Sequence, residues 1–358
     1  MNRYAASALK FFAYTVAALV ILLAVGVGLL RLMLPELPEY REEIRARASA
    51  AIGLDVEFER IDARWRLNGP ELIFTDVTLI DPGTGDAVLD ADEVSVGAAI
   101  LRVLRERRIS VGRLAVTGTS VTVERLGDGR FAVQGRAAET SEDVSGSDVP
   151  RDIRIVLEDV DFTYSDPRAR GGPLQARLTS LEWNRSGEDQ ELEARLEPGS
   201  ELGSALRILA TRRGGRQGDA PVWDVNVEAS DLDLGRLASI LPEEWPAPAA
   251  GIADVEIWSR FRDGLLRRAG ATLDARGLAP AVPGDAPLPT PYDLSARLEW
   301  ALNDGGWLAA VNDLRIERGD TLRPDSYVQV SAETDEDSRL SALEIQSGFL
   351  SMDDIRPF

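Results

Sequence analysis

The feature that most constrains this chain is an alternation of apolar and polar residues that slips by one position and then resumes. In the stretch 72–81, LIFTDVTLID, Leu72 and Phe74 share one parity, and Val77 and Leu79 share the other. Alternation with a period of two predicts a β-strand. A one-residue slip turns every later side chain to the opposite face of a strand, so this stretch needs a local device to keep one apolar face.

The same slip recurs along the chain, and two geometries account for it. A two-residue hairpin places the residues that flank its turn on one side, but such turns favour Asn-Gly or Asp-Gly. A β-bulge inserts one extra residue and restores the original face. The dipeptides found here fit a hairpin poorly, so we favour bulges or corners inside strands. The slips fall at Glu59-Arg60, Thr75-Asp76, Glu158-Asp159, Ser230-Asp231 and Asn312-Asp313, and over a longer gap between Val116 and Val121.

One continuous apolar face is therefore expected, and few helices are available to cover it. Helices are predicted over 98–107 and over 233–242, where Asp233 caps the start and Pro242 stops the helix. Two short helices cannot cover about fifteen strands, so the face must meet a second sheet, close on itself, or contact something else that is apolar. The candidate face residues are Val56, Phe58, Ile61, Trp65, Leu72, Phe74, Val77, Leu79, Ile155, Leu157, Val160, Phe162, Trp223, Val225, Val227, Trp307, Val311, Leu314 and Ile316.

Residues 11–30 form an uncharged apolar stretch between Lys10 and Arg31. Twenty helical residues span about 30 Å, the thickness of a bilayer core. We predict an uncleaved anchor; the alternative is a signal peptide, which has a shorter apolar core and a cleavage site of small residues. The anchor residues named by this prediction are Phe11, Phe12, Val20, Ile21, Leu22, Leu29 and Leu30.

The orientation of this anchor does not follow from counting charges, because arginines follow the span as well as precede it. Long domains translocate largely regardless of charge. A short basic N-terminal tail ahead of a large acidic domain favours an internal N-terminus and an exported body.

A helix is predicted next, over 35–53. Pro38 suits its first turn and Gly53 its C-terminal cap. Tyr40, Ile44, Ala48 and Ala51 form a narrow apolar stripe. The stripe either docks on the neighbouring domain or lies at the membrane surface.

Composition excludes several classes of function. The net charge of −20 argues against nucleic-acid binding. The absence of His and Cys excludes the Ser-His-Asp and Cys-His machineries, disulfides, and imidazole or thiolate metal sites. Acidic pairs such as Asp231 and Asp233 suit bulges, caps and loops better than a cation site, and a two-carboxylate glycosidase is the enzyme that composition leaves open. We therefore predict no catalytic, metal or cofactor site.

Linkers rich in Gly, Pro, Ala and acidic residues suggest the domain boundaries. They divide the chain into a tail and anchor (1–34), an amphipathic helix (35–53), a membrane-proximal β region (54–135), an acidic linker (136–150), a second β region (151–275), a Pro-rich linker (276–291) and a third β region (292–358).

The order of these features resembles the AsmA-like family, specifically its YhdP branch. An N-terminal span and amphipathic helix precede ARWRLNGPELIFTDVTLIDPGTGDAVL, then strand pairs, DLDLGRLASILP and GIADVEIWSRFRDGLL. The resemblance implies a mainly β fold: a transmembrane helix followed by an elongated, curved antiparallel sheet whose groove shields phospholipid acyl chains. It also implies an inner-membrane anchor, a periplasmic body, and a role in phospholipid transport to the outer membrane and in its integrity.

The resemblance leaves two points open. YhdP-like proteins are typically longer, and the final LSMDDIRPF resembles a strand-to-helix entry, so a truncated N-terminal portion is expected. The alternative function is a scaffolding envelope protein with a closed β-sandwich core, which binds other envelope proteins and carries no lipid.

Overall fold

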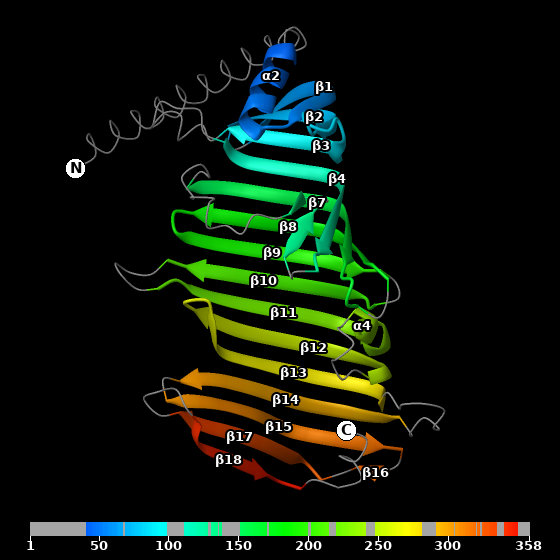
Figure 1. Ribbon diagram of the computed structural model, residues 1–358, viewed down its shortest axis with the longest axis vertical. Coiled ribbons are helices and arrows are strands. Elements are labelled where there is room, and N and C mark those ends of the chain that lie inside the picture. Colours follow the sequence, from blue (N-terminus) through cyan, green and yellow to red (C-terminus); the bar gives the residue numbers. More distant parts are fainter. Residues whose placement is uncertain are drawn as a thin grey trace, which may run out of the picture. The chain divides into compact units, whose positions relative to one another are not determined.

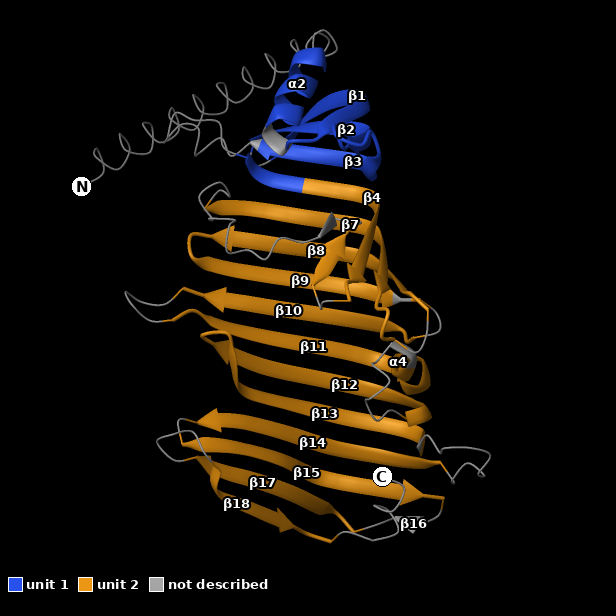
Figure 2. Cartoon of the chain, in the orientation of Figure 1, with its two compact units in different colours: residues 1–114 blue, residues 115–358 orange. Residues whose placement is uncertain are grey.

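The computed structural model describes most of the chain beyond the first forty residues. The described residues are 41–66, 69–98, 111–127, 130–134, 136–137, 151–169, 172–199, 202–214, 220–240, 248–280, 291–303, 305–319, 321–322, 324–334 and 340–349. The chain divides into two compact units, residues 1–114 and 115–358 (Figure 2). The domain boundaries expected from the linkers stay predictions.

The described residues of unit 1 form helix α2 and an antiparallel sheet (Figure 1). The sheet follows directly from the alternating stretches, because each becomes one long strand paired with the next. The elements are α2 (Arg41–Ile52), β1 (Asp55–Arg66), β2 (Gly69–Ile80), β3 (Ala87–Ala98) and the start of β4 (Val111–Arg125).

Helix α2 confirms the helix predicted between the apolar stretch and the first strand. Its first turn carries Glu42 and Glu43, which suit the positive end of the helix dipole. Gly53, at φ 76°, ends the helix and donates its N–H to the Ser49 carbonyl at 2.8 Å. The Ser49 hydroxyl accepts a hydrogen bond from the Val56 N–H at 2.9 Å, which ties the helix to β1.

Unit 2 is a meander of antiparallel strands that curves without closing on itself (Figure 1). β4 pairs with β5 and β7, β15 pairs with both β16 and β17, and the other neighbours pair in chain order. The elements are β5 (Phe131–Val133), β6 (Arg136–Ala137), β7 (Asp152–Ser165), β8 (Leu174–Ser186), β9 (Asp189–Pro198), β10 (Ala205–Arg213), β11 (Val222–Asp233), α4 (Leu234–Ile240), β12 (Pro248–Arg262), β13 (Leu265–Pro280), β14 (Tyr292–Asn303), β15 (Gly306–Arg318), β16 (Thr321–Leu322), β17 (Ser326–Thr334) and β18 (Leu340–Ser347).

The parity slips lie inside continuous strands, which confirms bulges or corners over hairpins. Four of them contain an Asp in the left-handed region, with φ of 53° at Asp76, 54° at Asp159, 51° at Asp231 and 52° at Asp313. Asp tolerates this conformation better than most residues. The β11–β12 ladder shifts register between Ala229 and Leu232, and the β15–β17 ladder shifts between Val311 and Leu314.

Slips in neighbouring strands also compensate each other. In the β1–β2 ladder, Phe58 lies opposite Val77 and Ile61 lies opposite Phe74, so both strands slip at one level and the register is unchanged. A true two-residue hairpin has different chemistry: Asp263 and Gly264, at φ 55° and 72°, join Arg262 to Leu265.

Helix α4 confirms the second predicted helix and its cap. The Asp233 carboxylate accepts a hydrogen bond from the Arg236 N–H at 2.9 Å. The helix predicted over 98–107 lies almost entirely outside the described residues, as does the whole anchor stretch 11–30. In the part of the chain that the structure does describe, no helix has both the length and the apolarity needed to cross a bilayer.

Candidate functional site

The ladders of unit 2 align apolar residues into a row that crosses ten strands without a polar member. The bulges make this possible, because each returns the following apolar residues to the same face. Nine strand spacings of about 4.8 Å give a row of roughly 43 Å. In order from β7 to β17 the row is Leu157, Leu181, Ala194, Ile208, Val227, Ile257, Ala271, Leu298, Val311 and Val328.

A second row runs beside the first and includes two tryptophans, Trp183 and Trp300. Ser259 is its one polar member among the residues in the ladders. The Trp300 ring stacks on the Trp307 ring, with centroids 5.5 Å apart. In order from β7 to β18 the row is Ile155, Trp183, Leu192, Ala210, Val225, Ser259, Ala269, Trp300, Ala309, Val330 and Ile345. We call the face that carries both rows the apolar face.

Much of the apolar face keeps contact with solvent. Ile257 is 37% exposed and Leu298 is 39% exposed. Part of the face is buried near β7–β9, where Val160 and Leu178 pack against Leu157, Leu181 and side chains of adjacent strands. Val121 of β4 packs against the same cluster. Helix α4 adds local cover, since Leu234 packs on Ala253, Ala275 and Leu278.

The opposite face of unit 2 is charged and crossed by ion pairs. Arg260 contacts Asp224 at 2.6 Å, and Arg315 contacts Asp325 at 3.0 Å. Three bulge aspartates also pair with an arginine: Asp159 with Arg177, Asp231 with Arg276, and Asp313 with Arg297. Exposed pairs of this kind contribute little stability each. Their arrangement makes the sheet charged on one face and apolar on the other.

In unit 1 the candidate face residues form a covered core. Ile44 and Ala48 of α2 pack against them, and the Phe58 and Phe74 rings meet edge-to-face with centroids 5.1 Å apart. The Arg41 guanidinium lies 5.3 Å from the Phe58 ring centroid. The exposed fractions of the core residues are 7% for Val56, 3% for Phe58, 7% for Ile61 and 4% for Val77, with Phe74 and Leu79 partly buried against them.

The remaining candidates lie along the same ladders and are partly buried. In unit 1, Trp65 lies opposite Pro70, and Leu72 lies opposite Ala63. In unit 2 the register places Phe162 opposite Ala176, Trp223 opposite Phe261, Leu314 opposite Ser326, and Ile316 opposite Leu294. The structure thus brings the unit 2 candidates to one face of their sheet. In unit 1 it brings Val56, Phe58, Ile61, Phe74, Val77 and Leu79 together with α2, and Trp65 and Leu72 continue the same ladder.

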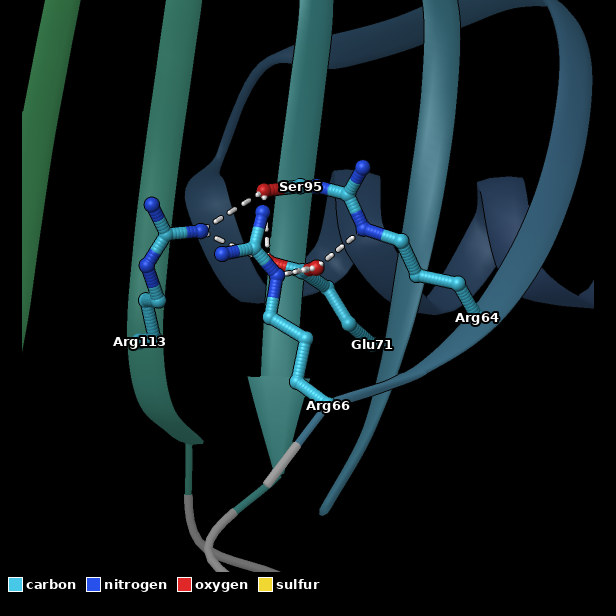
Figure 3. Close-up of polar contacts among 5 residues, drawn as sticks. All are labelled: Arg64, Arg66, Glu71, Ser95 and Arg113. Carbon is cyan, nitrogen blue, oxygen red and sulfur yellow. Dashed lines mark hydrogen bonds and ion pairs between the residues drawn. The ribbon is translucent and has the colours of Figure 1, made fainter. Parts of the chain in front are cut away.

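Unit 1 also holds a buried carboxylate beneath three arginines, which the sequence did not reveal (Figure 3). The Arg64 Nε and the Arg66 Nε donate to Glu71 Oε2 at 2.6 and 2.5 Å. The Arg113 Nη1 and the Ser95 hydroxyl donate to Oε1 at 2.6 and 3.0 Å. We call these five residues the Glu71 cluster.

Electrostatics keep Glu71 ionised although its side chain is only 2% exposed. Burial alone raises the pKa of the carboxyl, but hydrogen bonds from Arg64, Arg66 and Ser95 outweigh burial. Together they lower the pKa of Glu71 from 4.5 to about 2. The cluster therefore carries three positive charges and one negative charge at neutral pH.

The acidic pairs noted in the sequence have structural roles where the structure describes them. Asp231 forms a bulge and Asp233 caps α4. Within the described residues, no group of three or more acidic side chains is arranged to hold a metal ion.

Two features escaped the sequence reading for different reasons. Ile257 and Leu298 are members of the apolar row. The alternation is obscured at Ile257, because the next residue, Trp258, is also apolar although it lies on the opposite face. The Glu71 cluster depends on Arg113, which is 42 positions from Glu71 along the chain. The alternation of Arg64, Arg66 and Glu71 with apolar residues was the available signal.

Comparison with known proteins identifies the family. The family model described as YhdP protein matches residues 1–358. The chain belongs to the YhdP family. Membership is consistent with the mainly β, open sheet described above and indicates an envelope protein whose work is related to lipid transport. Neither a curated protein nor a solved structure matches the chain significantly.

Proposed function

We propose that this YhdP-family protein shields phospholipid acyl chains on the apolar face of unit 2 and thereby contributes to phospholipid transport between the inner and outer membranes. In this account the stretch 11–30 anchors the chain in the inner membrane and the β units lie in the periplasm. Phospholipids and the inner membrane are its partners, other envelope proteins can join it, and neither nucleic acid nor a catalytic step is involved.

The single observation that carries the proposal is the uninterrupted apolar row across ten strands, together with the exposure of Ile257 and Leu298. A large apolar surface that stays accessible marks an interaction site. Burial of apolar surface contributes about 0.8 kcal/mol per methylene. An acyl chain lying on the row is therefore held by many weak contacts.

The covered core of unit 1 has a different part in this proposal. Val56, Phe58, Ile61 and Val77 are covered by α2, so they form a closed core instead of a lipid-contacting surface. We propose that lipid contacts begin with residues of unit 2 whose side chains keep partial exposure.

The test is mass spectrometry of phospholipid that co-purifies with the full-length protein in detergent. The double variant Ile257→Asp with Leu298→Asp places two charges on the apolar row and should remove most specifically retained lipid. The control, Trp258→Asp with Thr272→Asp, places two charges on the opposite face and should retain lipid as the unmodified protein does. Equal retention by both variants would refute the proposal.

A further inference from the structure

The Glu71 cluster contains more positive charge than its carboxylate requires. One arginine neutralises one carboxylate, yet Arg64, Arg66 and Arg113 all contact Glu71. Three guanidinium groups and one carboxylate leave a local charge of +2. Within the described residues, Glu71 is the one acid at ion-pair distance from these arginines. Elsewhere, arginines such as Arg260 and Arg315 have an aspartate of their own.

The way these arginines bind Glu71 leaves donors free for a second anion. Arg64 and Arg66 each use Nε to reach the same oxygen, Oε2. Their terminal Nη groups take no part in those bonds, and the two side chains remain 43% and 47% exposed. Figure 3 shows the two guanidinium groups flanking the Glu71 carboxylate and meeting the same oxygen. An anion can therefore approach both from solvent.

The cluster is also preorganised. Glu71 is almost fully buried and fixes one edge of each guanidinium, while Ser95 and Arg113 hold its other oxygen. Arginine side chains lose rotamer freedom when they bind an anion, and here part of that loss has already occurred on folding. A planar guanidinium that presents two parallel N–H groups matches a phosphate especially well.

We propose that Arg64 and Arg66, held in place by Glu71, form a binding site for a phosphate group. The phosphate is that of a phospholipid headgroup if the proposed function holds, and this assignment rests on that function. The position along the chain fits a headgroup, because only residues 31–40 separate the predicted anchor from α2. Inorganic phosphate shares the same chemistry and is the other source.

The test is isothermal titration of the full-length protein in detergent with inorganic phosphate, at neutral pH and low salt. Arg64→Gln with Arg66→Gln should weaken phosphate binding about tenfold or more, because charge-assisted hydrogen bonds are lost. Arg260→Gln, which removes an exposed arginine of unit 2, should leave binding unchanged. Where the double variant does not fold, Arg66→Gln alone replaces it, since Arg64 and Arg113 still hold Glu71. Absent or undiminished phosphate binding would overturn the site.

Competition by the short-chain lipid dihexanoyl phosphatidylglycerol identifies the source of the phosphate. Displacement of inorganic phosphate by this lipid supports a headgroup site. Phosphate binding that the lipid does not reduce would overturn the headgroup assignment. The variant Ile257→Asp with Leu298→Asp should keep full phosphate affinity, so failure of the apolar face and failure of the phosphate site are told apart.

Discussion

Glu71 shows how a single buried residue couples stability to pH. Its folded pKa of about 2 lies below its ordinary value of 4.5, so its contribution is present above pH 4.5 and is lost as the pH falls toward 2. The difference corresponds to about 3 kcal/mol. We predict that Glu71→Gln loosens β2 at pH 7 and makes little difference near pH 2, as measured by hydrogen exchange of peptides from residues 69–80. A difference in exchange rate between the variant and the unmodified protein that does not decrease at low pH would contradict this prediction.

Aspartate at the bulges is the second residue-scale feature. Asp231 has φ 51°, and its N–H donates to the Asp254 carboxylate at 2.9 Å. A β-branched residue is disfavoured in this conformation by about 1–2 kcal/mol. Asp231→Val should therefore lower the urea midpoint of unit 2, while Asp231→Gly, which accepts positive φ, should have a much smaller effect. Equal effects would mean that backbone conformation does not determine the residue here.

At the scale of elements, the position and stability of helix α4 depend on its N-terminal cap and on its close approach to β12. A Cβ at Gly235 would lie 2.6 Å from the Ala249 carbonyl oxygen, so only glycine lets the helix approach β12 this closely. Asp233→Ala should cost about 1 kcal/mol of helix stability, because the Arg236 N–H loses its acceptor. Faster hydrogen exchange over residues 234–240 checks this, and Asp233→Ser serves as the control that keeps an acceptor.

Elements were largely predictable, because period and capping are local properties. The slip across Ser230-Asp231 identified a bulge, and Asp233 with Pro242 identified a helix. The pairing of the strands could not be predicted from the sequence. Which strand lies beside which determines that Ile257 joins the row and that Arg113 reaches Glu71, and a single sequence does not state the register. Trp258 obscured the pattern further, because it places an apolar residue on the charged face.

The pairing of the strands also decides which candidate face residues are useful to substitute, because it decides which of them are buried. Val160 is only 1% exposed and Phe58 only 3%. A charge at either position would be buried without a partner and would destabilise the fold, whatever the protein binds. Ile257 and Leu298 are the informative positions, because a charge there remains in contact with solvent.

At the scale of the whole molecule, the account rests on the two faces of the unit 2 sheet having different partners. One face carries exposed ion pairs and is hydrated. The other face carries rows of apolar side chains that can contact acyl chains. A scaffold with a dry core would instead bury the exposed members of these rows against protein. Ile257 and Trp258 separate the two accounts, because they are adjacent, lie on opposite faces, and are 37% and 46% exposed.

The most direct measurement is photo-cross-linking in cells, with a photoreactive amino acid at position 257 or 258 of the full-length chain. The account predicts phospholipid adducts from position 257 and few from position 258, although both side chains are accessible. Adducts with protein alone at position 257, or equal lipid adducts at both positions, would contradict it.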